Sequence, residues 1–258
     1  MRVLVFTDLD GTLLDHETYS YAAALPAIAA LKMRGAVIVM ASSKTAQEMA
    51  VLHRALELGD MPMIVENGAA LVRPDQMRKD GTVYARLRAA LEAVPEDLRR
   101  LFKGFGDMSV AEVAQSTGLS DAQAAQAKAR AFSEPGVWTG SKEQEAAFVS
   151  ALSQGGVQAK RGGRYLTLSF GGTKAGQMQA VIDRYQPDLT IALGDAPNDR
   201  EMLEAADIGV IIRNDHGTGL PCLAGEETGR IRRSSAQGPE GWNSAILAIL
   251  AEYEKEEG

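Results

Sequence analysis

The amino-acid sequence predicts an α/β fold, in which a doubly wound parallel-sheet core carries a smaller inserted α/β module. Strand-like apolar runs alternate with helical patterns in the first third of the chain, this rhythm changes after Asn67-Gly68 with a polar turn at residues 73–81, and it resumes at residue 171. We therefore expect residues 1–80 and 171–258 to form the core and residues 81–170 to form the module. With 258 residues and 45% hydrophobic content, the chain can bury a core of this size.

The core is expected to contain alternating strands and helices. Short runs rich in Val, Ile and Leu predict the strands, and apolar residues at helical spacing predict the helices between them. The predicted strands are 3–6, 37–40, 62–65, 190–193 and 208–212. The predicted helices are 22–34, 46–58, 174–185 and 198–205, with a closing helix from Ser244.

The inserted module carries local signals of its own. Ser120 and Ser141 each precede a Gln by three residues, which is the capping-box pattern at the start of a helix. Residues 158–160 and 165–170 flank the turn Arg161-Gly162-Gly163-Arg164, and this arrangement predicts a β-hairpin. Because it interrupts the core, we expect the module to act as a lid or specificity element.

Composition and charge exclude several classes of partner. The net charge of −7 and isoelectric point near 5.1 provide no basic field for nucleic acid or an anionic membrane surface. No stretch reaches the roughly 20 apolar residues needed to cross a bilayer, and the sequence opens on a strand pattern rather than a secretory signal. The single cysteine, Cys222, excludes an internal disulfide. We expect a cytoplasmic monomer or dimer with a small-molecule partner.

Polar side chains directly follow four of the predicted strands. In open parallel sheets such residues meet at the carboxyl edge, where ligands bind. They are Asp8 and Asp10; Ser42, Ser43 and Lys44; Glu66 and Asn67; and Asp195, Asn198 and Asp199. Taken singly, each group also fits a turn or a helix cap. The carboxylates of Asp8, Asp10, Asp195 and Asp199 in one crevice would repel one another without a compensating charge, so we expect a hard divalent metal ion there.

The order of these motifs resembles that of the haloacid dehalogenase superfamily. Its four motifs correspond to residues 8–15, Ser42, Lys174 and residues 194–199. The large insertion between the second and third motifs resembles the Cof-like group, which carries an α/β cap. Within that group the sequence is most similar to the mannosyl-3-phosphoglycerate phosphatases, in the stretches 41–45, 66–68, 161–165 and 238–243.

This resemblance implies a Rossmann-like core and a covalent mechanism. Asp8 is expected to attack phosphorus and form an aspartyl-phosphate, and Asp10 to act first as general acid and then as general base. The resemblance also implies a Mg²⁺ ion bound by Asp8, Asp10 and Asp195, with Asp199 close by. The expected phosphate-binding residues are Ser42, Ser43, Lys174 and Asn198.

Substrate choice is expected to come largely from the cap and the loops that face it. The candidate substrate-binding residues are Lys44, Glu66, Asn67, Arg161 and Arg164. A guanidinium suits the carboxylate of a glycerate, although the two arginines also fit a role in hairpin solubility, and Asn67 fits a turn. The leading expectation is a phosphatase acting on mannosyl- or glucosyl-3-phosphoglycerate. The alternatives are a general sugar-phosphate phosphatase or phosphomutase of the same fold, and a non-catalytic phosphate-binding module.

Overall fold

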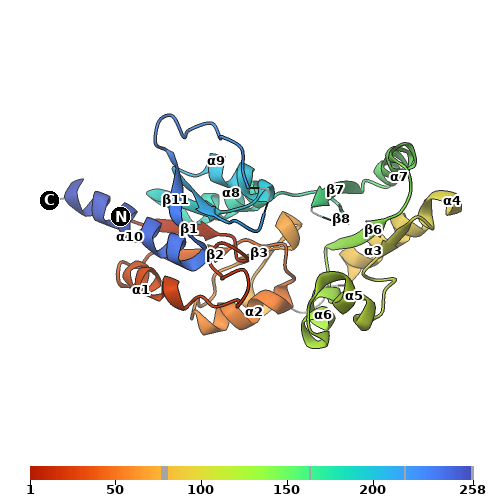
Figure 1. Ribbon diagram of the computed structural model, residues 1–258, viewed down its shortest axis with the longest axis horizontal. Coiled ribbons are helices and arrows are strands. Elements are labelled where there is room, and N and C mark those ends of the chain that lie inside the picture. Colours follow the sequence, from red (N-terminus) through yellow and green to blue (C-terminus); the bar gives the residue numbers. More distant parts are fainter. Residues whose placement is uncertain (77–80, 163, 218, 257–258) are drawn as a thin grey trace.

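The protein has two lobes, which we call the core and the cap (Figure 1). The computed structural model describes residues 1–76, 81–162, 164–217 and 219–256. The core is built on a five-stranded sheet and the cap on a four-stranded sheet. The start of β1 and the end of α10 lie on the side of the core that faces away from the cap (Figure 1). Among the described residues, no helix is both long and apolar enough to cross a bilayer.

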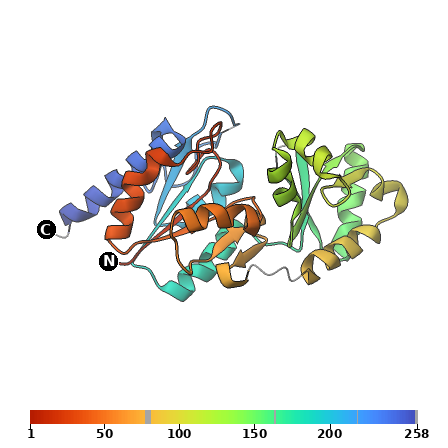
Figure 2. The ribbon, with the colours of Figure 1, turned by 90° about the horizontal axis from the view of Figure 1, so that it is seen from below.

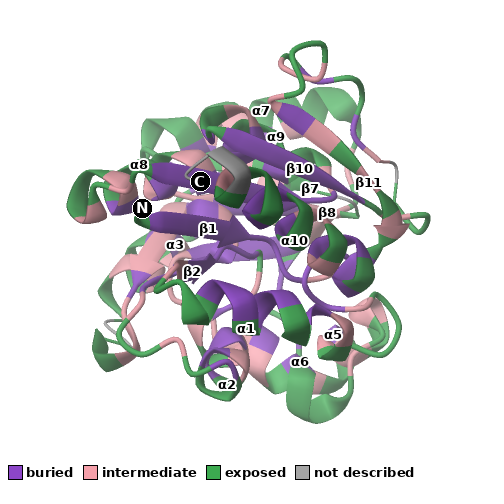
Figure 3. Cartoon of the chain, turned by 90° about the vertical axis from the view of Figure 1, so that its left-hand side faces the viewer, coloured by how far each residue is buried: buried purple, intermediate pink, exposed green. Residues whose placement is uncertain are grey.

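The core sheet is parallel throughout, with the strand order β11-β10-β9-β1-β2. Its strands are β1 (Val3–Thr7), β2 (Val37–Met40), β9 (Leu189–Gly194), β10 (Ile208–Arg213) and β11 (Ile231–Gln237). All residues of β1 are buried, because parallel sheets of this kind are covered on both faces. Figure 3 shows β1 and β10 as buried strands at the centre of the lobe.

Helices cover both faces of the core sheet, which confirms the predicted doubly wound α/β fold. Val3 and Val5 belong to one hydrophobic cluster, whereas Leu4 and Phe6 belong to the other, since alternate residues of a strand point to opposite faces. The first face packs against α1 (Leu25–Met33), α2 (Ala46–Ala55) and α10 (Gly238–Glu256). The second face packs against α8 (Lys174–Tyr185) and α9 (Arg200–Ala205).

The core differs from the sequence prediction at its C-terminal edge. The sequence does not predict β11, because Ile231 is the only buried member of this mostly polar strand, which includes Arg232 and Arg233. Such composition is common on edge strands, where charged side chains discourage pairing with another chain. The closing helix α10 begins at Gly238 instead of Ser244, and Pro239 fits its first turn.

The third predicted strand belongs to a small hairpin at the margin of the core. β3 (Met63–Val65) pairs antiparallel with β4 (Ala70–Val72), and a parallel bridge between Ala41 and Ile64 joins it to the end of β2. The 3-10 turn η2 (Glu66–Gly68) connects the two strands. A further 3-10 turn, η3 (Pro74–Gln76), follows β4 on the way to the cap.

The cap sheet is antiparallel, with the order β5-β6-β8-β7. Its strands are β5 (Phe102–Gly104), β6 (Ser133–Trp138), β7 (Gln158–Gly162) and β8 (Tyr165–Ser169). One face packs against α3 (Thr82–Glu92), α4 (Glu96–Arg99) and α7 (Lys142–Gln154), and the other against α5 (Val110–Thr117) and α6 (Asp121–Lys128). Figure 2 shows α5 and α6 on the side of this sheet that faces the core.

The local predictions for the cap agree with its structure. Ser120 and Ser141 form the expected capping boxes, and β7 and β8 form the expected hairpin. Gly163 of the hairpin turn lies outside the described residues, as does the expected domain boundary at residue 80. The division into residues 1–80, 81–170 and 171–258 therefore stays a proposal.

Candidate functional site

Three buried carboxylates converge at the carboxyl edge of the core sheet. Asp8 follows β1, Asp195 follows β9, and Asp199 ends the 3-10 turn η4 (Pro197–Asp199). One oxygen from each carboxylate lies within 4.8 Å of the other two. Asp8 and Asp195 meet because β1 and β9 are parallel neighbours, and Thr7 at the end of β1 pairs with Leu193 near the end of β9.

Lys174, the first residue of α8, lies between two of these acids. Its Nζ is 2.5 Å from Asp8 Oδ1 and 2.6 Å from Asp199 Oδ1, and the side chain is buried. Burial alone would lower the pKa of Lys174, but the adjacent Asp199 and Asp8 carboxylates raise it. Burial and the neighbouring Asp199 raise the pKa of Asp8. Lys174 therefore remains an ammonium ion and offsets part of the local negative charge.

The carboxylate of Asp195 is fixed by Thr12, which lies in the first predicted motif, and by Asn214, which the sequence prediction does not include. Thr12 Oγ1 donates to Asp195 Oδ1 over 2.9 Å, and Asn214 Nδ2 donates to Oδ2 over 2.6 Å. Burial nevertheless raises the pKa of Asp195. Asn214 directly follows β10, so the strand-end rule that identifies the other residues also identifies this one.

Gly11 is required where the first loop passes these groups. Its φ is +78°, and a Cβ there would lie 2.6 Å from Asn214 Nδ2 and 3.0 Å from Asp195 Oδ2. A side chain at position 11 would therefore displace the groups that orient Asp195.

Asp10 is held at the margin of the acidic cluster by Lys44. Lys44 Nζ lies 2.9 Å from Asp10 Oδ2 and 5.2 Å from the centre of the Tyr19 ring. Burial alone would lower the pKa of Lys44, but the neighbouring Asp10 raises it, so Lys44 stays an ammonium ion. Within the described part of the chain, the buried Asp10 Oδ1 has no hydrogen-bond partner. That oxygen is free to exchange a hydrogen bond with a bound molecule.

The predicted phosphate-binding loop lies next to the β3–β4 turn. Ser42 is buried and its Oγ accepts from Lys44 N over 3.3 Å, whereas Ser43 is exposed. The carbonyl oxygen of Ser42 accepts from Asn67 N over 2.8 Å. Asn67 Oδ1 in turn accepts from Asn198 Nδ2 over 3.1 Å, which connects three of the predicted loops.

The charge of this cluster fits a divalent cation. The carboxylates of Asp8, Asp195 and Asp199 face one ammonium group, from Lys174, so two negative charges lack compensation when all are ionised. Asp199 Oδ2 accepts from the backbone N–H groups of Asp195 and Ala196, over 3.2 and 3.1 Å. Both oxygens of Asp195 and both oxygens of Asp199 thus accept hydrogen bonds from the protein, whereas Lys174 contacts Asp8 at Oδ1.

A protein-family model covers most of this architecture. The model, described as a haloacid dehalogenase-like hydrolase, matches residues 5–125 and 156–218. The chain belongs to this family. The resemblance inferred from the order of the four motifs is thus confirmed.

This haloacid dehalogenase-like hydrolase is also similar to individual relatives and solved structures. A glucosyl-3-phosphoglycerate/mannosyl-3-phosphoglycerate phosphatase of Methanococcoides burtonii is 33% identical over 270 residues, covering 97% of this chain and 98% of the relative. A haloalkanoate-superfamily phosphatase structure from Bacteroides thetaiotaomicron matches with a TM-score of 0.66 and 20% identity, over 96% and 95% of the two chains. The structure of the sucrose-phosphatase of Synechocystis matches with a TM-score of 0.63 and 17% identity, over 98% of this chain and 99% of that one. Both solved structures share the fold.

The two predicted cap arginines of this hydrolase have partners within the cap. Arg161 Nε donates to Glu145 Oε1 over 3.0 Å, and about half of the Arg161 side chain is exposed. Arg164 Nη1 donates to the carbonyl oxygen of Ser116 over 2.6 Å. These contacts fit a role in the hairpin surface, so substrate binding by either arginine stays a prediction.

The β3–β4 turn contacts the start of α8 so closely that position 68 must be glycine. A Cβ on Gly68 would lie 2.1 Å from the carbonyl carbon of Thr173 and 2.4 Å from Lys174 N. Its φ of +89° is also one that L side chains rarely adopt. The turn that carries Asn67 thus sets the position from which Lys174 enters the acidic cluster.

Proposed function

We propose that this hydrolase is a Mg²⁺-dependent phosphatase that removes phosphate from mannosyl- or glucosyl-3-phosphoglycerate and releases the glycosylglycerate. The observation that carries the reaction type is the buried contact of Asp8 with Lys174, beside Asp195. The substrate is supported by the relative from Methanococcoides burtonii, which matches nearly the whole chain.

Asp8 is the proposed nucleophile. Lys174 bonds to Asp8 Oδ1, which leaves Oδ2 to attack phosphorus in line and form an aspartyl-phosphate. The bond between phosphorus and the oxygen on carbon 3 of the glycerate breaks in this step. The Lys174 ammonium also stabilises negative charge on the phosphoryl oxygens.

Asp10 is the proposed acid and base. Its buried Oδ1, which lacks a partner among the described residues, would carry the proton to the departing glycerate oxygen. The same carboxylate would then take a proton from the water that attacks the aspartyl-phosphate, which releases inorganic phosphate and restores Asp8. Lys44 orients Asp10 through its contact with Oδ2.

Mg²⁺ is the proposed metal ion, because it prefers oxygen ligands and tolerates a site with few protein ligands. Asp8, Asp195 and the Asp10 carbonyl oxygen would hold it, with Asp199 fixing the adjacent loop and Lys174. When bound, the ion supplies positive charge to the phosphoryl oxygens.

The remaining predicted residues have supporting roles in this proposal. Ser42, Ser43 and Asn198 would bind the phosphoryl group, and Lys44, Asn67, Arg161 and Arg164 would contact the sugar-glycerate part. The cap would provide most of the selectivity, since phosphoryl transfer itself is similar for different leaving groups. The exposed, unpaired Cys222 is compatible with the reducing cytoplasm, which is the proposed compartment.

The test is a phosphate-release assay with and without Mg²⁺ on mannosyl- and glucosyl-3-phosphoglycerate, free 3-phosphoglycerate and hexose phosphates. We expect Mg²⁺-dependent release from a glycosyl ester, no detectable release by Asp8→Asn, and normal release by the exposed control Asp60→Asn. Comparable turnover of simple hexose phosphates would favour a general phosphatase, and bisphosphate-dependent isomerisation would identify a mutase. Phosphate binding without any turnover would instead identify a binding module.

A further inference from the structure

Among the described residues, the partners of the Glu66 carboxylate, in the core turn η2, all come from one segment of the cap. Its Oε1 accepts from Ala131 N over 2.9 Å, and its Oε2 accepts from Phe132 N over 3.1 Å and from Ser133 Oγ over 2.8 Å. Glu66 is 3% exposed. The sequence suggests Glu66 as a substrate ligand, but this carboxylate is occupied by residues 131–133.

Arg130 extends these contacts to the phosphate-binding loop. Its Nε lies 3.3 Å from Glu66 Oε2, and its Nη2 donates to Ser133 Oγ over 2.9 Å and to the carbonyl oxygen of Ser43 over 3.1 Å. Charged groups buried in this way are stable only when they are paired and hydrogen-bonded. One guanidinium therefore joins the Glu66 carboxylate, the cap and the loop that carries Ser42.

The backbone of the Glu66 turn is held in an unusual conformation. Glu66, Asn67 and Gly68 have successive φ values of +50°, +63° and +89°. Left-handed backbone at a long side chain persists only where its surroundings fix it, and such sites cluster where position matters for function. Here Glu66 N donates to the carbonyl oxygen of Lys44 over 2.9 Å and Asn67 N to that of Ser42 over 2.8 Å. The turn is thus tied to the phosphate-binding loop through its own backbone.

Two further contacts support the same junction. Phe132, from the cap, packs against the hydrophobic cluster on one face of the core sheet. Thr45 Oγ1, at the start of α2, donates to the carbonyl oxygen of Gln126 in α6 over 3.2 Å. The cap segment around residues 126–133 therefore rests on the core directly over residues 42–45.

We propose that Glu66 is a positioning residue that couples the cap to the phosphate-binding loop. By holding residues 130–133, it fixes the cap in the place where the cap can contact the leaving group of a substrate bound at Asp8. This inference rests on the proposed phosphatase function. It assigns Glu66 no contact with the substrate, because its two carboxylate oxygens already accept from the cap.

The decisive variant is Glu66→Gln, which keeps the shape of the side chain but removes its charge and one acceptor oxygen. We expect kcat/KM for the glycosyl-3-phosphoglycerate to fall about 10- to 100-fold, the range expected when hydrogen bonds to a charged group are lost. The fall for p-nitrophenyl phosphate should be at least tenfold smaller, since its small leaving group does not depend on the cap.

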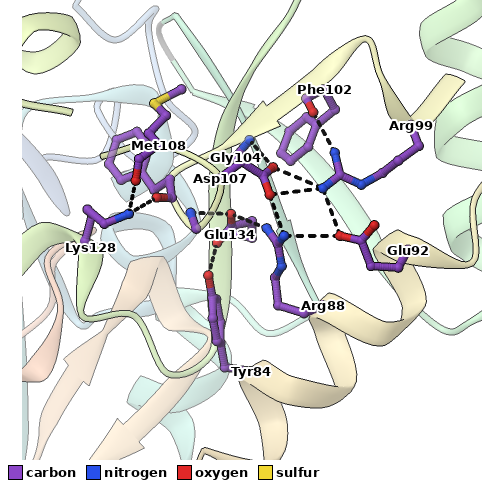
Figure 4. A network of polar contacts seen from close by, with 12 residues as sticks. Tyr84, Arg88, Glu92, Arg99, Phe102, Gly104, Asp107, Met108, Lys128 and Glu134 are labelled. Carbon is purple, nitrogen blue, oxygen red and sulfur yellow. Dashed lines mark hydrogen bonds and ion pairs between the residues drawn. The ribbon is translucent and has the colours of Figure 1, made fainter. Parts of the chain in front are cut away.

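Glu134→Gln is the matched control. Glu134 is another buried carboxylate, but its partners Tyr84, Arg88 and Gly106 all belong to the cap, as Figure 4 shows for the first two. It therefore shares the loss of a buried charge without touching the core. We expect Glu134→Gln to change kcat/KM for the two substrates by similar factors.

Hydrogen exchange gives a readout that does not depend on activity. The amides of Ala131 and Phe132 donate to Glu66, so both should exchange at least tenfold faster in Glu66→Gln than in the wild type or in Glu134→Gln. Ser133→Ala removes one contact from the cap side and should shift both readouts in the same direction by a smaller factor.

Equal losses for both substrates, or unchanged exchange at Ala131 and Phe132, would overturn the positioning role. If the wild type hydrolyses no glycosyl ester, the proposed function fails, whereas the exchange experiment still decides whether Glu66 holds the cap.

Discussion

At the scale of single residues, Lys174 is the side chain on which the acidic cluster depends. It is buried between Asp8 and Asp199, and both carboxylates lose this ammonium partner if it is replaced. We expect Lys174→Met to lower phosphate release by about 100- to 1000-fold, as for the loss of one group that stabilises transition-state charge. The measurement is kcat at saturating Mg²⁺.

Lys32→Met is the control for Lys174→Met, because Lys32 forms a solvent-exposed pair with Glu57. It should keep wild-type activity. A Lys174→Met enzyme within tenfold of wild type would contradict the assigned role.

His53 gives the protein a pH-dependent stability. It is buried in α2 and donates from Nε2 to the carbonyl oxygen of Met61 over 2.8 Å, and burial lowers its pKa below the ordinary 6.5. Below about pH 6.5 the unfolded chain takes up this proton before the folded protein does, so the free energy of unfolding falls as pH falls towards the lowered pKa. We expect urea titrations from pH 8 to 5 to show this loss.

In His53→Gln the contribution of this residue disappears. Asp8 and Asp195, whose raised pKa values act in the opposite direction, remain in both proteins and cancel in the comparison. The difference in unfolding free energy between the two proteins should therefore shrink as pH falls. Parallel pH profiles would exclude the assignment to His53.

Individual site residues could be predicted where the neighbouring sequence alone indicates their position in the fold. Asp8 and Asp195 follow apolar strands, and the parallel-sheet rule brings such residues together, so the sequence was enough to place them. Glu66 also follows a strand, but its partners lie in residues 130–133. No periodicity or spacing reveals a contact between segments so far apart, and its carboxylate was therefore expected to face a substrate.

At the scale of elements, the N-terminal caps of two helices allow a matched comparison. Thr45 forms a capping box with Glu48 at the start of α2, and Ser141 forms one with Gln144 at the start of α7. Removing either cap should cost about 1 kcal/mol. Thr45 also donates to the carbonyl oxygen of Gln126 in the cap, so Thr45→Ala should cost about 1 kcal/mol more.

Chemical denaturation of Thr45→Ala and Ser141→Ala measures this difference in unfolding free energy. Equal destabilisation of the two variants would mean that the hydrogen bond between α2 and α6 contributes nothing measurable.

The elements that could be predicted are those in which buried apolar residues repeat at the spacing of a helix or a strand. Helix α8 and strand β2 have the predicted bounds because apolar positions repeat along them. β11 could not be predicted, since it is added at a sheet edge where one side chain, Ile231, is buried. The hairpin β3–β4 is short, and its pairing depends on a left-handed turn that the letters Glu-Asn-Gly only partly indicate.

At the scale of the whole molecule, the two lobes have separate hydrophobic clusters. Phe148 stacks on Phe102 with the ring centres 5.4 Å apart and lies 4.8 Å from the Trp138 ring, all within the cap. We expect Phe148→Ala to cost about 3–5 kcal/mol. It should unfold the cap first, so that hydrolysis of glycosyl-3-phosphoglycerate is lost at lower urea concentrations than hydrolysis of p-nitrophenyl phosphate.

Phe6→Ala is the counterpart in the core, where Phe6 is fully buried in β1. Both activities should disappear together in this variant. If Phe148→Ala also loses both activities at one urea concentration, the lobes unfold as a single unit and the proposed domain division has no energetic meaning.

The close contact at Gly68 has a consequence for how such a molecule can change over evolutionary time. The polypeptide leaves the core just beyond this point and re-enters beside it, since a Cβ on Gly172 would lie 2.4 Å from the Gly68 carbonyl oxygen. Because the core holds the two ends of the inserted segment close together, the segment does not distort the core, whatever its length or fold. The core can therefore accept unrelated insertions at this junction through recombination. Such an insertion would change the substrate without changing the residues of the core.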